Sequence, residues 1–422
     1  MQNKYFVKNV STYFGANLIN GISALLLLPI LTRFLTVESY GQVALFQSLY
    51  WAVAAFVGIT VAGASDRKYF EVSDTKYLAD FIGVCFQICL CLTLVTSCIF
   101  YFFQAKFSSL FGISPQYIFF AIFVSVSISI SQIRLGQWQA RGQSFSFGIF
   151  QVLQSGLIVL MATLLIVVFN FNELGRILAQ VMISGIFALV AIYLLYKDQL
   201  LNFFVWSPKK IKEVLSFAIP LIPHVGGVFL ISMADRFFIA KDLGVANAGI
   251  YMLAAQLAMI VSLFHESLNR AFQPWLFEKL TLNKLQDKKM IVKYTYSWFL
   301  VILASAPIFF LIGPGLVGLI AGPEYAQAGR IFGWLALGHS FTGMYAMLNS
   351  YLYFSKKTYY LSIVTLFSGV LNIILLIYFL KYFGVIGAGI AFSISMFVRF
   401  FLTWLVASFI HPMPWLSFYK KN

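Results

Sequence analysis

The sequence predicts an all-α protein that crosses a membrane about twelve times. Of its 422 residues, 61% are hydrophobic and only 10% are charged, and the mean hydropathy is +0.87. A soluble globular chain carries about 25% charged residues. The apolar residues also gather in runs of roughly 20, which is the length that an α-helix needs to cross the hydrocarbon layer. These observations favour a polytopic helical membrane protein.

The apolar runs fall into two sets of six, separated by a polar stretch. We therefore expect an N-terminal six-helix bundle over 1–197, a cytoplasmic linker over 198–212 and a C-terminal six-helix bundle over 213–422. The predicted spans are 10–35, 40–64, 78–103, 115–137, 147–170, 174–196, 213–240, 246–270, 290–313, 328–354, 358–381 and 386–410.

The distribution of basic residues supports this topology and orients it. With the N-terminus in the cytoplasm, twenty-one of the 29 Lys and Arg residues fall inside, seven fall outside, and Arg399 lies within the last span. Cytoplasmic loops of membrane proteins carry such an excess. We expect both termini in the cytoplasm. The net charge of +15 then reflects topology and contacts with anionic lipid headgroups, not a nucleic-acid surface.

The two halves of the sequence resemble each other where the first and seventh predicted spans end. PILTRFLTVESYGQVALFQSL (29–49) and SMADRFFIAKDLGVANAGIYMLAAQL (232–257) both place an Arg-Phe pair, a short polar turn and a Gly before the next span. Six spans per half is an even number, so the repeats would be parallel and related by a pseudo-two-fold axis along the membrane normal.

Arg399 is the clearest functional candidate, because a charge within a span is costly to bury in lipid. Counted from residue 386, it lies about 20 Å along its helix, close to the middle of the bilayer. Two roles stay open for this side chain. It could bind an anion in a cavity, or it could pair with a carboxylate and hold helices together.

The seventh predicted span is the most informative helix. Pro220 and Pro223 each remove a backbone donor, and we expect them to open the helix beside protein or a wet cavity. His224 lies about 16 Å from Glu213 along this helix, again close to the midplane. It could carry protons, or it could be a hydrogen-bonded packing residue.

Asp235 lies about 33 Å from Glu213 on the same predicted span, which places the Asp235-Arg236 pair at the outer mouth. The pair could be a salt bridge that fixes the next turn, an exit-side phosphate contact or a gate. Glu266 and Arg270 have i,i+4 spacing, which favours an intrahelical salt bridge at the cytoplasmic interface over ion coupling.

Arg134 and Arg141 flank the inner end of the fourth span, where they could line the cytoplasmic mouth or act only as a topology signal. The four cysteines all fall within 85–98, without the spacing of a zinc site. No P-loop, HExxH motif or nucleophile elbow occurs. We expect no catalytic residues, no metal and no cofactor.

The quoted repeat segments, together with FAIPLIPHVGGVFLISMADRFFIAKDLGVANAGIYMLAAQLA, resemble the polysaccharide-biosynthesis flippases of the multidrug/oligosaccharidyl-lipid/polysaccharide (MOP) exporter superfamily. The most similar branch is that of the O-antigen (Wzx-type) transporters, and the likeness covers essentially the whole chain. This resemblance implies two bundles in a V around a central cavity that opens alternately to each side of the bacterial inner membrane.

The resemblance also implies the substrate, an oligosaccharide repeat unit on undecaprenyl pyrophosphate that moves from the cytoplasmic to the periplasmic leaflet. Cationic residues line the cavity in that family, and the positions here that match its motifs are Arg33, Asp235 and Arg236. Ion counterflow would reset the carrier, with His224, Glu266 and Asp235 as candidates. A polysaccharide polymerase and a chain-length regulator are the implied protein partners.

Two alternatives remain open at this point. A drug or small-cation exporter of the same superfamily would need an acidic residue at mid-membrane depth, and none of the 14 acidic residues lies there in the predicted spans. A membrane polysaccharide polymerase or ligase would need a sizeable external loop. The longest external connection predicted here is roughly 104–114.

Overall fold

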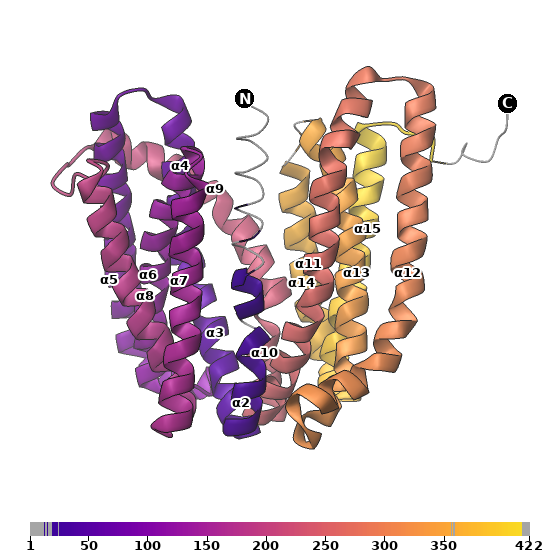
Figure 1. The fold of residues 1–422 in the computed structure, drawn as a ribbon, viewed down its shortest axis with the longest axis horizontal. Helices are drawn as coiled ribbons and strands as arrows, with labels where there is room; N and C mark the ends of the chain where they lie inside the picture. Colours follow the sequence, from indigo (N-terminus) through magenta and orange to yellow (C-terminus); the bar gives the residue numbers. More distant parts are fainter. Residues whose placement is uncertain are drawn as a thin grey trace. The chain divides into compact units, whose positions relative to one another are not determined.

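The computed structural model describes residues 19–23, 25–355, 357 and 359–415, together with Thr12 and Gly15. Over these residues the regular secondary structure is helical throughout, as predicted (Figure 1). The elements are α2 (Leu28–Phe34), α3 (Val37–Val57), α4 (Ile59–Glu71), α5 (Thr75–Phe111), α6 (Pro115–Ala140), α7 (Ser144–Thr163), η1 (Leu164–Val168), α8 (Asn172–Lys197), α9 (Pro208–Ser232), α10 (Asp235–Leu243), α11 (Val245–Leu282), α12 (Leu285–Ala321), η2 (Pro323–Tyr325), α13 (Ala326–Phe354), α14 (Tyr359–Phe383) and α15 (Val385–Ile410).

The lengths and compositions of these helices confirm a multi-span membrane protein. Within the described residues, nine helices are long and apolar enough to cross a bilayer, and the bent pair of α3 and α4 would make a tenth. The apolar helix Ile19–Phe34 and α13 coincide with two further predicted spans. The number twelve stays a prediction. The start of the first predicted span and both chain ends lie outside the described residues.

The second predicted span, 40–64, is bent and not one straight helix. The two helices of this pair, α3 and α4, meet at Gly58 and differ in direction by 47°. A Cβ atom at Gly58 would lie 2.7 Å from the Cβ of Ser129 and 2.8 Å from the Sγ of Cys89. Only glycine allows α5 and α6 to approach the chain so closely at this bend.

The seventh predicted span also differs from the expectation. α9 continues through Pro220 and Pro223, so the prolines do not end or open the helix, and it stops at Ser232. Asp235 and Arg236 begin a separate short helix, α10. The depth of about 33 Å, which assumed one continuous helix of 1.5 Å rise per residue, therefore does not apply to this pair.

The polar segment 271–289, which lies between the predicted spans 246–270 and 290–313 and so would be a cytoplasmic connection, is helical over most of its length. α11 extends to Leu282 and α12 begins at Leu285, so the turn occupies two residues. Asn283 turns the chain with a left-handed backbone, φ 51°, a conformation that Asn tolerates better than most residues. Charged side chains made this segment resemble a loop, although they suit the exposed face of a long helical hairpin.

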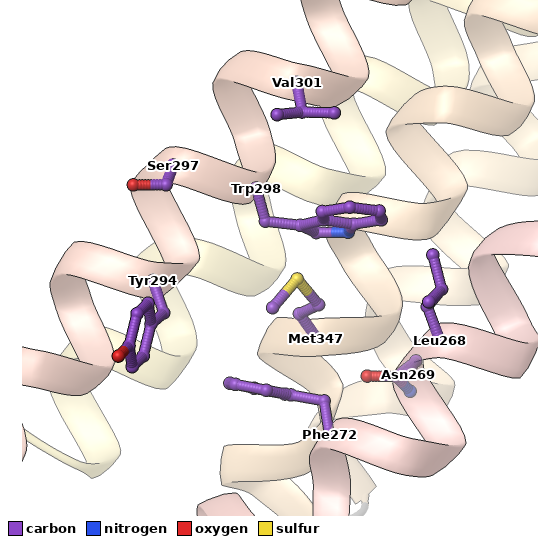
Figure 2. Close-up of a pocket in the computed structure, with 8 residues that line it drawn as sticks. All are labelled: Leu268, Asn269, Phe272, Tyr294, Ser297, Trp298, Val301 and Met347. Carbon is purple, nitrogen blue, oxygen red and sulfur yellow. The ribbon is translucent and has the colours of Figure 1, made fainter.

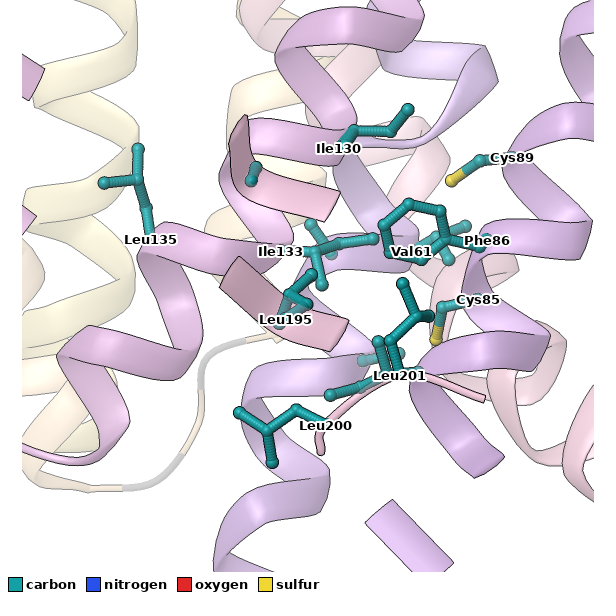
Figure 3. Close-up of a cluster of buried hydrophobic side chains, with 14 of the residues drawn as sticks. Val61, Cys85, Phe86, Cys89, Ile130, Ile133, Leu135, Leu195, Leu200 and Leu201 are labelled. Atoms are coloured by element: carbon teal, nitrogen blue, oxygen red, sulfur yellow. The ribbon is translucent and has the colours of Figure 1, made fainter. Parts of the chain in front are cut away.

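The described chain forms two compact units, Met1–Gly226 and Gly227–Asn422. In the first unit, α6 packs against α3, α4, α5, α7 and α8. Its sequence SVSISIS supplies small side chains that let neighbouring helices approach, and the Ser125 hydroxyl donates to the Tyr50 carbonyl at 2.7 Å. Cys85 and Cys89 lie in the apolar core of this unit (Figure 3).

Two ion pairs hold the first part of α9 to the first unit. Lys68 of α4 pairs with Glu213, and Lys210 of α9 lies 2.8 Å from Asp80 of α5. These contacts explain why the unit boundary falls within α9 at Gly226 and not in the segment 198–212. The division into two six-helix bundles joined by a linker stays a prediction.

The second unit is built around α13, which packs against α11, α12, α14 and α15. Its glycines let these helices pack tightly. A Cβ atom at Gly329 would lie 2.6 Å from the Cα of Pro314 on α12. The core of the unit joins apolar side chains of α11, α12, α13 and α15, among them Phe299, Leu348 and Phe400.

Candidate functional site

The Asp235-Arg236 pair forms a closed, buried network. Only 3% of Asp235 and 7% of Arg236 is exposed, and their carboxylate and guanidinium lie 2.8 Å apart. The Tyr251 hydroxyl of α11 donates to the other carboxylate oxygen at 2.5 Å. Arg236 also donates to the carbonyl of Ser232, the last residue of α9. This network ties α9, α10 and α11 together, which favours the structural role among those predicted.

Arg399 has a different environment in the same unit. Its side chain is half-buried on α15, its Nη2 donates to the Thr365 hydroxyl of α14 at 3.0 Å, and its guanidinium lies 3.9 Å from the ring centroid of Tyr345 on α13. Its Nε is buried without a hydrogen-bond acceptor among the described residues, and no described carboxylate pairs with it. The positive charge is therefore held by a ring and a hydroxyl, and not neutralised.

Arg33 is the counterpart of Arg236 in the first half of the chain, yet the two are not equivalent. Arg33 is exposed in the last turn of α2 and makes no ion pair with the part of the chain that the structure describes. An exposed guanidinium without a carboxylate can reach a phosphate oxygen. Its role as a phosphate contact stays a prediction.

The two candidates for ion coupling besides Asp235 lie in different settings. His224 is half-buried on α9. Glu266 is exposed, and its carboxylate lies 2.6 Å from the guanidinium of Arg270 one turn later on α11. The predicted intrahelical salt bridge is confirmed, and it gives both side chains a partner that a transported ion would have to displace.

The arginines at the end of α6 are held by packing. Arg134 is buried, pairs with Asp198 after α8, and lies 4.3 Å from the ring centroid of Trp138. Arg141 lies 5.3 Å from the ring centroid of Tyr69. Each guanidinium therefore contacts an aromatic face, an arrangement that stabilises a cation at a partly desolvated position.

Sequence reasoning missed two ionisable side chains in the first unit. Arg176, at the start of the predicted span 174–196, is buried on α8 and donates to Gln180 at 3.1 Å without a described carboxylate partner. Asp66 is half-buried on α4 against Gly136 of α6, accepts from the Ser65 hydroxyl at 3.3 Å and makes no ion pair with the described residues. Each lies beside a predicted span end, where hydropathy does not distinguish a loop from a helix.

An apolar pocket of about 330 Å³ opens within the second unit between α11, α12 and α13 (Figure 2). Phe272, Trp298, Val301 and Met347 are among the apolar side chains that line it, and its polar side chains are those of Asn269, Tyr294 and Ser297. A pocket with this lining suits a hydrocarbon chain and offers no cation to a diphosphate. Among the described residues, no group of three or more His, Cys, Asp or Glu side chains could hold a metal ion.

Comparison with known proteins identifies relatives along the whole chain. A family described as "Polysaccharide biosynthesis protein" matches residues 6–280. "Lsg locus putative protein 1" of Haemophilus influenzae is 26% identical over 398 residues, covering 90% of this chain and 94% of that protein. "Capsular polysaccharide biosynthesis protein CapF" of Staphylococcus aureus is 22% identical over 408 residues, covering 93% and 96%.

Solved structures share the fold at low sequence identity. The structure described as "Lipid II flippase MurJ, inward closed conformation" has a TM-score of 0.76 at 14% identity, covering 95% of this chain and 87% of that one. An inward-facing multidrug resistance MATE family transporter of the MOP superfamily has a TM-score of 0.72 at 17% identity, with 93% of each chain covered. The fold is therefore that of MOP superfamily transporters, as the resemblance implied.

Proposed function

The chain belongs to the polysaccharide biosynthesis protein family, and from this premise we propose that it is a flippase for a lipid-linked oligosaccharide. The substrate would be an O-antigen-like repeat unit on undecaprenyl pyrophosphate. The protein would move it from the cytoplasmic to the periplasmic leaflet of the bacterial inner membrane by alternating access, with both chain termini in the cytoplasm. The shared fold with a lipid II flippase supports this proposal.

Arg399 is the observation that carries the proposal. A diphosphate cannot cross hydrocarbon unaided, because its charges lose their hydration there. A guanidinium offers paired N–H donors that match phosphate oxygens. Arg399 keeps its Nε without an acceptor among the described residues and lacks a described carboxylate, so a pyrophosphate would supply both missing interactions.

The membrane potential would favour export of this substrate. With the cytoplasm negative, outward movement of an anion is favourable by about 2.3 kcal/mol per charge per 100 mV. Counterflow of protons or another cation would then reset the empty carrier. His224 and Glu266 remain candidates for this step, and the carboxylate of Asp66, which makes no ion pair with the described residues, joins them. A polysaccharide polymerase and a chain-length regulator would act on the exported units.

Deletion of the gene tests the proposal directly. Lipid-linked oligosaccharide should accumulate in the cytoplasmic leaflet, where it is protected from a membrane-impermeant glycosidase added to intact spheroplasts. Complementation with the wild-type gene should restore its accessibility. Units that remain accessible in the deletion strain would contradict the proposed transport.

Asp66 supports one alternative, an exporter of organic cations with the same fold. Its half-buried carboxylate lacks a cationic partner among the described residues, and such a group can bind a cationic drug or a coupling ion. This alternative expects the deletion strain to become sensitive to ethidium, and Asp66→Asn to reproduce that sensitivity. The flippase proposal expects wild-type ethidium resistance in both strains.

A polymerase or ligase is the second alternative. The short connections between helices weigh against it, because α5 is followed by α6 after three residues and α7 with η1 is followed by α8 after three. Such an enzyme would leave its unpolymerised units in the periplasmic leaflet when deleted. The glycosidase experiment therefore separates this alternative from transport.

A further inference from the structure

A polar hollow of about 290 Å³ lies in the first unit, apart from all the residues considered so far. It is formed where three helices begin: α3 with its N-cap Thr36, α6 with its N-cap Ser114, and α8. The side chains that line it carry hydroxyl, carboxyl or amide groups. The starts of these three helices therefore form a hydrophilic recess in a largely apolar unit.

Hydrogen bonds within the first unit fix part of this lining. The Ser39 hydroxyl donates to one carboxylate oxygen of Glu173 at 2.7 Å, and the Gln42 amide donates to the Gly112 carbonyl at 3.0 Å. These bonds orient the two side chains across the hollow. The amide oxygen of Gln42 is buried without a donor among the described residues, and Glu38 makes no ion pair with them. The amide oxygen of Gln42 and the carboxylate of Glu38 therefore keep acceptor capacity within the described part of the chain.

The charges around the hollow favour a neutral ligand. Glu38 and Glu173 lie in the first turns of α3 and α8, where the free N–H groups and the helix dipole offset a negative charge. Two carboxylates repel an anion, and three helix N-termini disfavour a bare cation. The hollow therefore favours a molecule with many hydroxyl groups. Its carboxylate and amide oxygens can accept hydrogen bonds from hydroxyls, and its serine, threonine and tyrosine hydroxyls can also donate.

We propose that this hollow binds one sugar ring of the exported oligosaccharide. Its volume lies just below the range of about 300–1,000 Å³ for small-molecule pockets, which suits a single ring and not a chain. The segments that form it, 36–42, 112–117 and 173, lie at connections predicted to be external. The site would therefore hold sugar on the exit side. This inference rests on the proposed function.

Saturation-transfer NMR on the purified protein in lipid nanodiscs tests the site, since the method detects weak sugar binding. The probes are the monosaccharides released by acid hydrolysis of the surface polysaccharide of the host. At least one should receive saturation from the wild type. The double variant Glu38→Gln/Glu173→Gln should reduce that signal at least fivefold, because the amides keep the shape but lose both carboxylate acceptors.

Two further variants make the result specific to the hollow. Ser114→Trp should abolish the signal by filling the space, and the Ser114 side chain makes no capping hydrogen bond that would be lost. Glu324→Gln changes an exposed glutamate of η2 in the other unit and should keep the full signal. Thermal midpoints close to wild type would show that the variants fold.

The outcomes are decisive in both directions. No saturation of any probe, equal saturation in the wild type and the double variant, or displacement of the sugar by calcium or sodium chloride would overturn the sugar site. Accumulation of inner-leaflet units in the deletion strain would still support the flippase in that case. Sugar binding at the hollow without such accumulation would retain the site and overturn the proposed function.

Discussion

Arg236 and Arg399 belong to the same unit and show two ways of keeping an arginine in a membrane protein. Arg236 has its own carboxylate, Asp235, and both are almost fully buried. Arg399 has the ring of Tyr345 and the hydroxyl of Thr365. A buried ion pair is saturated and acts as structure, whereas a cation with only weak partners can exchange them for an anionic ligand. A charged side chain within a span therefore indicates a binding function where no opposite charge neutralises it.

The largest effect is expected for Arg236→Ala. This change leaves Asp235 charged and buried without its cation, which costs about 3–5 kcal/mol. The yield of monodisperse protein and its thermal midpoint in detergent should fall sharply, and surface polysaccharide should be lost because the protein does not accumulate. The double variant Asp235→Asn/Arg236→Leu, which removes both charges, should recover much of the folded protein.

This result decides between the roles proposed for the pair. Normal amounts of stable Arg236→Ala protein without surface polysaccharide would contradict a structural role. They would support the exit-side phosphate contact or gate.

Arg399→Ala should have the opposite profile. The protein should insert and melt as the wild type does, because no carboxylate among the described residues loses its partner. Transport should fall at least tenfold, which corresponds to about 1.4 kcal/mol of lost interaction. Arg399→Lys should recover part of it, since an ammonium keeps the charge but not the paired donors. The leaflet assay on complemented deletion strains measures both.

Tyr345→Phe is the matched control for Arg399. It keeps the aromatic face beneath the guanidinium and should leave transport unchanged. Wild-type transport by well-expressed Arg399→Ala would remove this residue from the mechanism and, with it, the main support for a diphosphate substrate.

Most of the fold could be predicted from the sequence, because span length and hydropathy are local properties. The break before Asp235 and the bend at Gly58 could not. Both depend on neighbours distant in sequence: the bend needs Ser129 and Cys89 against a missing side chain, and the break is fixed by Tyr251. The charged segment 271–289 was misjudged because an exposed helix face and a loop have the same composition.

The candidate residues were found from the sequence more easily than their roles. Arg399 stands out because it lies in the middle of a predicted span, whereas the other basic residues lie near the ends of the spans or between them. Arg399 lacks a carboxylate partner among the described residues, and its hydrogen-bond partner Thr365 lies 34 positions away. Arg236 pairs with its neighbour Asp235, which depends on the side-chain conformations of the two residues. The polar hollow is formed by the starts of three helices that are spread over more than 130 positions in the sequence. No local sequence motif therefore predicts it.

Arg134→Gln should have an intermediate effect and extends the comparison to the first unit. Arg134 is buried like Arg236, but its partner Asp198 is 41% exposed. Water can therefore solvate the carboxylate left behind. We expect a loss of about 1–2 kcal/mol from the ion pair and the contact with Trp138, seen as a modest fall in thermal midpoint with transport retained. A loss of transport at full stability would place Arg134 at the cytoplasmic mouth.

The smallest effect is expected for Glu266→Gln, because the Glu266–Arg270 pair is more exposed to solvent than the pairs of Arg236 and Arg134. Its side chains are 52% and 57% exposed, and an exposed i,i+4 pair contributes about 0.3–0.5 kcal/mol. Stability and transport should both stay close to wild type. Transport that loses its pH dependence in this variant would identify Glu266 as the coupling group, and exposure would then be a requirement for ion access instead of a sign of a minor role.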